Sequence, residues 1–143
     1  MSDAVLEAML LRHEGLRLKP YRDSVGKLTL GVGRNLDDVG ISRDEALVLL
    51  RNDVARTQAA LDAALPWRGG LDPVRGRVLV DMAFNLGVAG LLGFPDTLAA
   101  VRAGRFAQAA EHMLASRWAG QVRARALELA AMMRTGRDVE ADA

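Results

Sequence analysis

Residues 43 to 65 form a long stretch that contains neither glycine nor proline. Because glycine and proline are the strongest helix breakers, this stretch predicts one continuous helix of about five or six turns. Ser42 and Glu45 have the spacing of a capping box at its start, and Pro66 ends it. A helix of this length favours a fold in which it connects two different parts of the chain.

The part of the chain before this helix changes its hydrophobic period. Ser2 is a candidate N-cap for a first helix whose apolar residues recur at spacings of three and four, and Gly15 ends that helix. Residues 16–33 instead alternate apolar and polar side chains, which is typical of two short strands. Residues 23–27 form the turn between these strands. We therefore expect a β-hairpin in a small N-terminal lobe.

The part after Pro66 carries only helical signals. Asp72 is a candidate cap for a helix that has Pro73 at its first position and runs to Leu86, where Gly87 stops it. Three shorter helices are expected at about 96–103, 106–116 and 121–134. The sequence therefore predicts an α+β fold that is mostly helical, with a helical C-terminal lobe.

Length and composition indicate one domain over residues 1–143. We expect a small lobe at about 14–60 and a helical lobe at about 66–136, with the N-terminal helix belonging to the helical lobe. A cleft between two lobes is the usual place for a ligand. No apolar run is long enough to span a membrane, and no secretory signal is visible at the N-terminus, so we expect no membrane insertion.

Basic residues concentrate between Arg12 and Arg34, where six bases accompany only two acids, Glu14 and Asp23. The local net charge is +4, whereas the whole chain carries +1. This near balance argues against nucleic acid as a partner, because DNA-binding domains usually carry a strong positive charge. The chain has no cysteine, and its two histidines lack the spacing of a zinc motif, so we expect no metal and no cofactor.

Two isolated carboxylates in a basic hairpin indicate cleavage of a polysaccharide. Glycosidic cleavage without a metal needs one protonated acid and a second carboxylate that acts as base, nucleophile or charge stabiliser. Glu14 lies at the negative end of the first helix and is the candidate acid, whereas Asp23 lies at the accessible hairpin turn. Thr29 lies across the turn and can hold a water molecule together with Asp23. Gly31 and Gly33 are expected on the strand face of Thr29, where a polymer can approach the backbone closely.

The hairpin also contains the pattern E-G-x-x-L-x-x-Y-x-D-x-x-G-x-x-T-x-G-x-G, which resembles the phage lysozyme family, glycoside hydrolase family 24. Three later segments resemble the same family, so the resemblance covers nearly the whole chain. The pattern is filled by Glu14, Gly15, Leu18, Tyr21, Asp23, Gly26, Thr29, Gly31 and Gly33, and the later segments are 82–87, 116–118 and 134–136.

The resemblance implies a lysozyme-like fold of two lobes and assigns roles to individual residues. It implies that Glu14 is the catalytic acid and that Asp23 and Thr29 complete the catalytic site. The substrate-binding residues that it implies in the helical lobe are Phe84, Asn85, Thr97, His112 and Arg125.

The resemblance further assigns a partner to the catalytic glutamate, and the chain departs from the family at two places. The partner arginine falls on Arg125, with Arg117 and Arg123 as alternatives. Many members have histidine where this chain has Arg34, which leaves Arg34 to substitute for it, to form a salt bridge elsewhere or to contact substrate. The segment 35–41 is short, so a third strand of the small lobe is expected to be reduced or missing.

Together these features predict an endolysin-type muramidase. It would hydrolyse the β-1,4 bond between N-acetylmuramic acid and N-acetylglucosamine in peptidoglycan, and the resemblance implies inversion. Two alternatives remain: a lytic transglycosylase that acts on the same bond, and a non-catalytic module that binds wall glycans. We expect a monomer whose partner is peptidoglycan. Without an export signal, it is expected in the host cytoplasm until a holin-type pore gives access to the wall.

Overall fold

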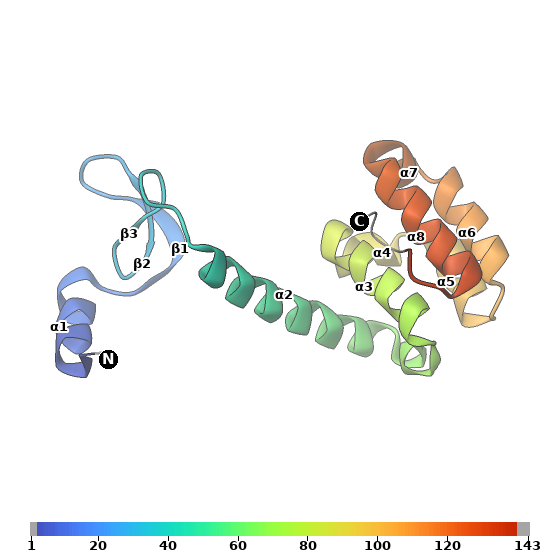
Figure 1. The fold of residues 1–143 in the computed structure, drawn as a ribbon, viewed down its shortest axis with the longest axis horizontal. Coiled ribbons are helices and arrows are strands. Elements are labelled where there is room, and N and C mark those ends of the chain that lie inside the picture. The colour runs from blue at the N-terminus through green and yellow to red at the C-terminus, as the bar shows by residue number, and fades with distance from the viewer. Residues whose placement is uncertain (1–2, 140–143) are drawn as a thin grey trace. The chain divides into compact units, whose positions relative to one another are not determined.

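The computed structural model describes residues 3–139, and its contacts divide the chain into two compact units. The first unit extends to Leu49 and the second begins at Leu50, within the long helix. A small sheet lies in the first unit, and the other regular elements of both units are helices (Figure 1). The mostly helical α+β class predicted from the sequence is therefore confirmed.

Helix α1 (Ala4–Glu14) is the first element. Its N-cap is Asp3, whose carboxylate accepts a 3.0 Å hydrogen bond from the backbone N–H of Leu6. Ser2, the cap expected from the sequence, lies outside the described residues, and the observed cap is one position later. Gly15 ends the helix as predicted, with a φ of 77° that other residues rarely adopt.

A three-stranded antiparallel sheet in the order β1–β2–β3 follows α1 (Figure 1). The predicted hairpin is confirmed, because β1 (Arg17–Arg22) pairs with β2 (Leu28–Gly31). Backbone hydrogen bonds close the turn at 23–27 between these strands. Strand β3 (Arg34–Asn35) has only two residues, so the third strand is reduced, as the short segment after the hairpin predicts.

Helix α2 (Arg43–Ala64) is the long helix expected from the stretch without glycine and proline. Its capping box is confirmed: Ser42 Oγ accepts a 3.1 Å hydrogen bond from the N–H of Glu45, and Glu45 Oε1 accepts a 2.9 Å bond from the N–H of Ser42. A short 3₁₀ helix, η1 (Pro66–Gly70), follows α2. Proline therefore ends the long helix where the sequence predicts.

Six α-helices follow η1 in the described part of the second unit. They are α3 (Pro73–Leu86), α4 (Val88–Leu92), α5 (Pro95–Arg102), α6 (Phe106–Ala115), α7 (Arg117–Val122) and α8 (Ala124–Thr135). Asp72 caps α3 as predicted, with its carboxylate accepting a 3.0 Å hydrogen bond from the N–H of Arg75. The sequence prediction omitted α4 and α7.

The helix expected over 121–134 is wrong at its beginning, because this segment belongs to two helices. Arg123 separates α7 from α8 with a positive φ of 46° and a ψ of −101°, a conformation outside the helical region. No glycine or proline marks this break, which explains why the helical pattern concealed it.

The core of the second unit is a cluster of buried hydrophobic side chains from residues of α2 to α8, among them Trp118. Arg75 ties α3 to the end of α8: its Nε donates to the carbonyl of Met133 at 2.7 Å and its Nη2 to that of Arg134 at 3.1 Å. The guanidinium also lies 3.6 Å above the ring of Phe106. A side chain at Gly136 would come within 2.9 Å of Arg75, so the glycine that ends α8 leaves room for this contact.

The sequence predicts that α1 belongs to the helical lobe. The contacts of α1 group it with the first unit, and its predicted place in the helical lobe stays a prediction. Within residues 3–139, no helix has both the length and the apolar composition required to cross a bilayer.

Candidate active site

Glu14 is the last residue of α1, and its side chain is exposed in the first unit. Gly33, in the turn after β2, lies directly against its carboxyl group: a Cβ atom at Gly33 would lie 2.9 Å from Glu14 Oε2. The hollow around the carboxyl group is lined by Glu7, Leu10, Leu11, Val32 and Gly33. The end of α1 therefore presents an accessible carboxyl group whose position is limited on one side by backbone.

The backbone of Lys27 brings Asp23 and Thr29 together. Asp23 Oδ1 accepts hydrogen bonds from the N–H groups of Val25 at 3.0 Å and Lys27 at 2.8 Å. The carbonyl of Lys27 accepts 2.9 Å hydrogen bonds from the N–H of Asp23 and the hydroxyl of Thr29. Within the described residues, Asp23 Oδ2 accepts no hydrogen bond from the protein. The turn thus orients the carboxylate and the hydroxyl and leaves one carboxylate oxygen available.

The strand face expected for Gly31 and Gly33 is wrong for Gly33, which lies outside β2, whereas Gly31 is the last residue of this strand. Thr29 is buried in β2, with 3% of its surface exposed, and pairs with Tyr21 across the hairpin. Gly31 ends β2 with a φ of 72°, and Gly33 lies in the following turn with a φ of 71°. Because extended strands have negative φ, the strand does not continue past Gly31. The two glycines permit the turn and the close approach of Glu14.

Arg34 forms a bidentate salt bridge with Glu45, which decides among the three roles that the sequence left open. Its Nη1 donates to Glu45 Oε1 and its Nη2 to Glu45 Oε2, both at 2.8 Å. Hydrogen bonds from Arg34, then from Ser42, hold the pKa of the Glu45 carboxyl at about 2 instead of its ordinary 4.5. The same contact raises the pKa of Arg34. Glu45 therefore both caps α2 and anchors the residue after Gly33.

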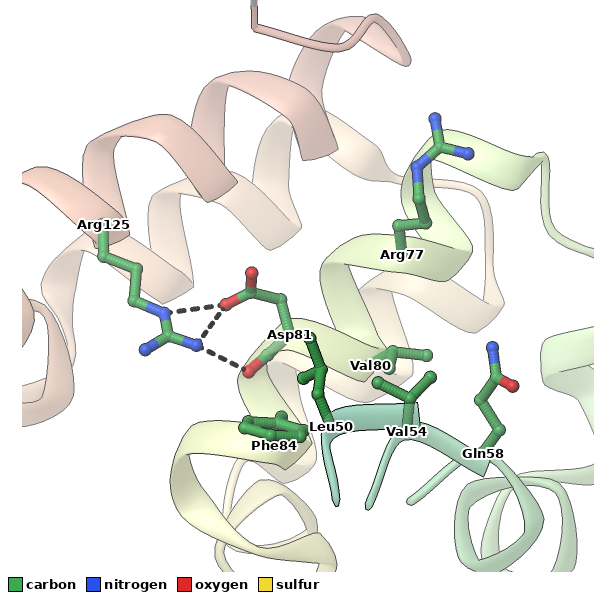
Figure 2. A pocket seen from close by; sticks show the side chains of 8 residues that line it. All are labelled: Leu50, Val54, Gln58, Arg77, Val80, Asp81, Phe84 and Arg125. Atoms are coloured by element: carbon green, nitrogen blue, oxygen red, sulfur yellow. Dashed lines mark hydrogen bonds and ion pairs between the residues drawn. The ribbon is translucent and has the colours of Figure 1, made fainter. Parts of the chain in front are cut away.

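A second group of candidate residues lines an open pocket of about 390 Å³ within the second unit (Figure 2). Phe84 lies at this pocket with 43% of its surface exposed, so it is no core residue. Arg125 donates from Nε to Asp81 Oδ1 at 2.7 Å and from Nη2 to the carbonyl of Asp81 at 3.2 Å (Figure 2). Arg125 thus has a carboxylate partner inside the second unit, and its predicted pairing with Glu14 stays a prediction.

The remaining three residues implied by the resemblance lie outside this pocket. Asn85 Oδ1 accepts a 2.8 Å hydrogen bond from Trp118 Nε1. Thr97 is buried, with 3% of its surface exposed. His112 lines a different pocket, together with Asp96, Ala99, Ala100, Arg105 and Gln108. The structure therefore does not gather these three with Phe84 and Arg125 at one pocket.

Sequence reasoning missed two carboxylates that fix candidate residues. Asp81 lies 44 positions from Arg125, and no local pattern connects them. The spacing of Ser42 and Glu45 in the sequence indicated only that Glu45 caps the long helix. Its contact with Arg34 depends on the path of the chain from β3 to α2. Within residues 3–139, no cluster of three histidine, cysteine, aspartate or glutamate side chains could hold a metal ion.

The small sheet-bearing unit, the long helix and the helical unit define a mostly helical, lysozyme-like α+β fold. The sequence matches the phage lysozyme family over residues 11–133, and the chain belongs to this family.

Comparison with curated relatives gives three informative similarities. The chain is 29% identical over 156 residues to the pre-baseplate central spike protein Gp5 of Enterobacteria phage T4, covering 90% of this chain and 27% of the spike protein. It is 33% identical over 84 residues to an endolysin of Acyrthosiphon pisum secondary endosymbiont phage 1, covering 56% of each protein. It is 30% identical over 130 residues to the SAR-endolysin of Escherichia phage Mu, covering 85% of this chain and 74% of that protein. The chain thus spans about a quarter of the first relative and just over half of the second.

Proposed function

We propose that this protein hydrolyses the β-1,4 bond between N-acetylmuramic acid and N-acetylglucosamine in bacterial peptidoglycan. The observation that carries the proposal is the joint fixing of Asp23 and Thr29 on Lys27, in the same unit that presents the exposed carboxyl group of Glu14. Membership of the phage lysozyme family supports this chemistry, as does the similarity to two proteins named as endolysins.

In the proposed mechanism, Glu14 donates a proton to the oxygen of the leaving sugar as the glycosidic bond breaks. A water molecule attacks the anomeric carbon from the opposite face. The hydroxyl of Thr29 donates to the Lys27 carbonyl, so its lone pairs are available to accept from this water. Asp23 takes the water's proton through the oxygen that has no protein donor within the described residues. One displacement of this kind inverts the anomeric configuration, so the first product is the α-anomer.

The proposal is tested by replacing the acid while keeping its shape. Glu14→Gln should fold with an unchanged circular dichroism spectrum and lose wall lysis, because an amide is far too weak an acid to transfer a proton to the leaving oxygen. Removal of a general acid typically lowers a rate by about 10²–10⁴-fold. The matched control is Glu111→Gln, which alters an exposed glutamate of α6 outside the hollow around Glu14 and should retain activity. Undiminished lysis by Glu14→Gln would exclude Glu14 as the acid.

The main alternative chemistry is that of a lytic transglycosylase, which cuts the same bond and leaves 1,6-anhydro products. The fixed pair of Asp23 and Thr29 favours hydrolysis, because a transglycosylase does not need to hold a water molecule. Mass spectrometry of the released muropeptides distinguishes the two, since the anhydro product is lighter by one water. A non-catalytic wall-binding module would bind purified walls and release no product with time.

We propose further that the protein acts on the wall as a monomer and reaches it from the host cytoplasm through a holin-type pore. The similarity to a SAR-endolysin offers a different route of release, and the similarity to a phage spike protein offers a place in the virion. Expression in cells with and without a holin discriminates among these settings. Lysis that requires the holin supports the proposed route, and lysis without it favours release by another route.

A further inference from the structure

The backbone of Gly33 lies close to the carboxyl group of Glu14. A Cβ atom at Gly33 would lie 2.9 Å from Glu14 Oε2 and 3.3 Å from its Cδ, and the first distance is shorter than real contacts allow. Gly33 also has a φ of 71°, which strains any residue with a side chain. The position of this backbone segment therefore limits where the Glu14 carboxyl group can lie.

The sheet by itself holds this segment weakly. Strand β3 has two residues, and its register with β2 consists of the pairs Thr29–Asn35 and Leu30–Arg34. Such a short strand at the edge of a sheet contributes few backbone hydrogen bonds. The turn that contains Gly33 therefore needs a further contact to keep a defined position.

Arg34 supplies that contact through its side chain. Its guanidinium makes two 2.8 Å hydrogen bonds to Glu45, and its Nη1 also donates to the carbonyl of Gly40 at 3.1 Å. Glu45 is itself held by Ser42 in the capping box of α2. A rigid helix end is thus connected to Arg34, and through one peptide bond to Gly33.

We propose that the Arg34–Glu45 ion pair positions the acid of the catalytic site: by anchoring the backbone at Gly33, it limits where the Glu14 carboxyl group can lie. This inference rests on the function proposed above. Arg34 and Glu45 are positioning residues, because they act through Gly33 and do not touch the reacting atoms. A guanidinium is required because its planar fork engages both oxygens of Glu45, whereas the ammonium group of lysine binds as a point charge.

The test compares two Arg→Lys substitutions that both keep the positive charge. Arg34→Lys loses the bidentate geometry, and Arg56→Lys alters an exposed ion pair with Asp53 elsewhere on α2. With soluble peptidoglycan strands as substrate, Arg34→Lys should lower kcat by about tenfold and leave KM within about twofold, because small misplacements of a catalytic group cost rate. Arg56→Lys should leave both constants unchanged. An unchanged kcat for Arg34→Lys, or a change confined to KM, would overturn the proposal.

Glu45→Gln provides the second variant, and it applies equally if Arg34→Lys folds poorly. It keeps an oxygen for the capping box and loses the charge that holds Arg34. The double variant with Arg34→Lys should be no slower than the slower single variant, because both remove the same contact. Multiplicative losses in the double variant would show that the two residues act separately and would contradict the proposal.

A readout without substrate separates this inference from the proposed function. In the free protein, the carbon-13 resonance of the Glu14 carboxyl group should shift in Arg34→Lys and in Glu45→Gln, and it should stay in place in Arg56→Lys. If wild-type protein fails to cleave walls, the proposed function falls, and a shifted resonance still supports the positioning of Glu14. If wild type is active and neither kcat nor the resonance responds, the positioning proposal alone falls.

Discussion

The indole N–H of Trp118 makes a hydrogen bond although the side chain is buried in the core of the second unit. Its ring is buried, with 3% of its surface exposed, and packs edge-on against Phe94 at 6.3 Å between ring centroids. The indole N–H donates to Asn85 Oδ1 at 2.8 Å. Buried polar groups without a partner are costly, so this single amide accounts for the burial of the indole N–H. Asn85 therefore has a structural role in addition to the substrate contact that the family resemblance implies.

Replacing this amide should destabilise the helical unit. Asn85→Leu leaves the indole N–H of Trp118 without its partner, and we expect a loss of roughly 1–3 kcal/mol in the free energy of unfolding. Urea denaturation measures this loss, with Asn52→Leu on the exposed surface of α2 as the matched control. Equal stability of the two variants would show that the hydrogen bond contributes little.

At the scale of the element, one carboxylate at the beginning of α2, that of Glu45, has three stabilising roles. Glu45 closes the capping box with Ser42, lies in the first turn where a negative charge is favourable, and binds Arg34. Hydrogen bonds from Arg34 and then Ser42 lower the pKa of Glu45 to about 2. The start of the long helix and the third strand are thus stabilised by the same ionised group.

This lowered pKa predicts a pH dependence of stability. A carboxyl group whose pKa is lower in the folded state stabilises the fold above its unfolded pKa, and the contribution disappears as the pH falls through the folded pKa. For Glu45 the window lies between the ordinary value of 4.5 and about 2. The difference in Tm between wild type and Glu45→Gln should therefore be constant above about pH 5 and should shrink as the pH approaches 2.

Thermal unfolding followed by circular dichroism across this pH range measures the effect. Glu111→Gln, an exposed glutamate of α6, is the matched control, and its Tm should follow that of wild type at every pH. A gap between wild type and Glu45→Gln that stays constant down to pH 2 would contradict the role of the ionised carboxylate.

At the scale of the whole molecule, charge is distributed unevenly. The chain carries +1 overall, whereas the segment from Arg12 to Arg34 carries +4. The structure reduces this excess, because Arg22 lies 3.5 Å from Asp37 and Lys27 lies 3.2 Å from Asp38. Exposed bases such as Lys19 would attract the stem-peptide carboxylates of the proposed peptidoglycan substrate.

Wall lysis should therefore weaken as salt increases. Between about 0.1 M and about 1 M salt the Debye length falls from about 10 Å to about 3 Å, which screens the attraction of exposed bases for the polymer. We expect the double variant Arg12→Gln with Lys19→Gln to lyse walls more slowly at low salt and to respond less steeply to added salt. Turbidity of purified walls over a salt series measures both, and a flat profile for wild type would argue against electrostatic attraction.

Local signals determined the elements that carry the catalytic candidates. A glycine with positive φ ended α1 at Glu14, turn chemistry placed Asp23 between two strands, and the capping box began α2. Each of these signals acts through backbone conformation or hydrogen bonds within a few residues, so the sequence alone contains them. The predicted hairpin, long helix and mostly helical class were correct for this reason.

Only the tertiary structure decided which side chains meet. Arg125 meets Asp81 across 44 positions, and Asn85 meets Trp118 across 33, because helices separated in the chain pack together. The split of the last predicted helix at Arg123 carries no local breaker in the sequence. The partner of Arg34 likewise depended on where the chain returns after β3. Each of these side chains has several chemically possible partners in the sequence. Which partner it meets depends on how distant segments pack, and neither composition nor spacing along the chain determines that packing.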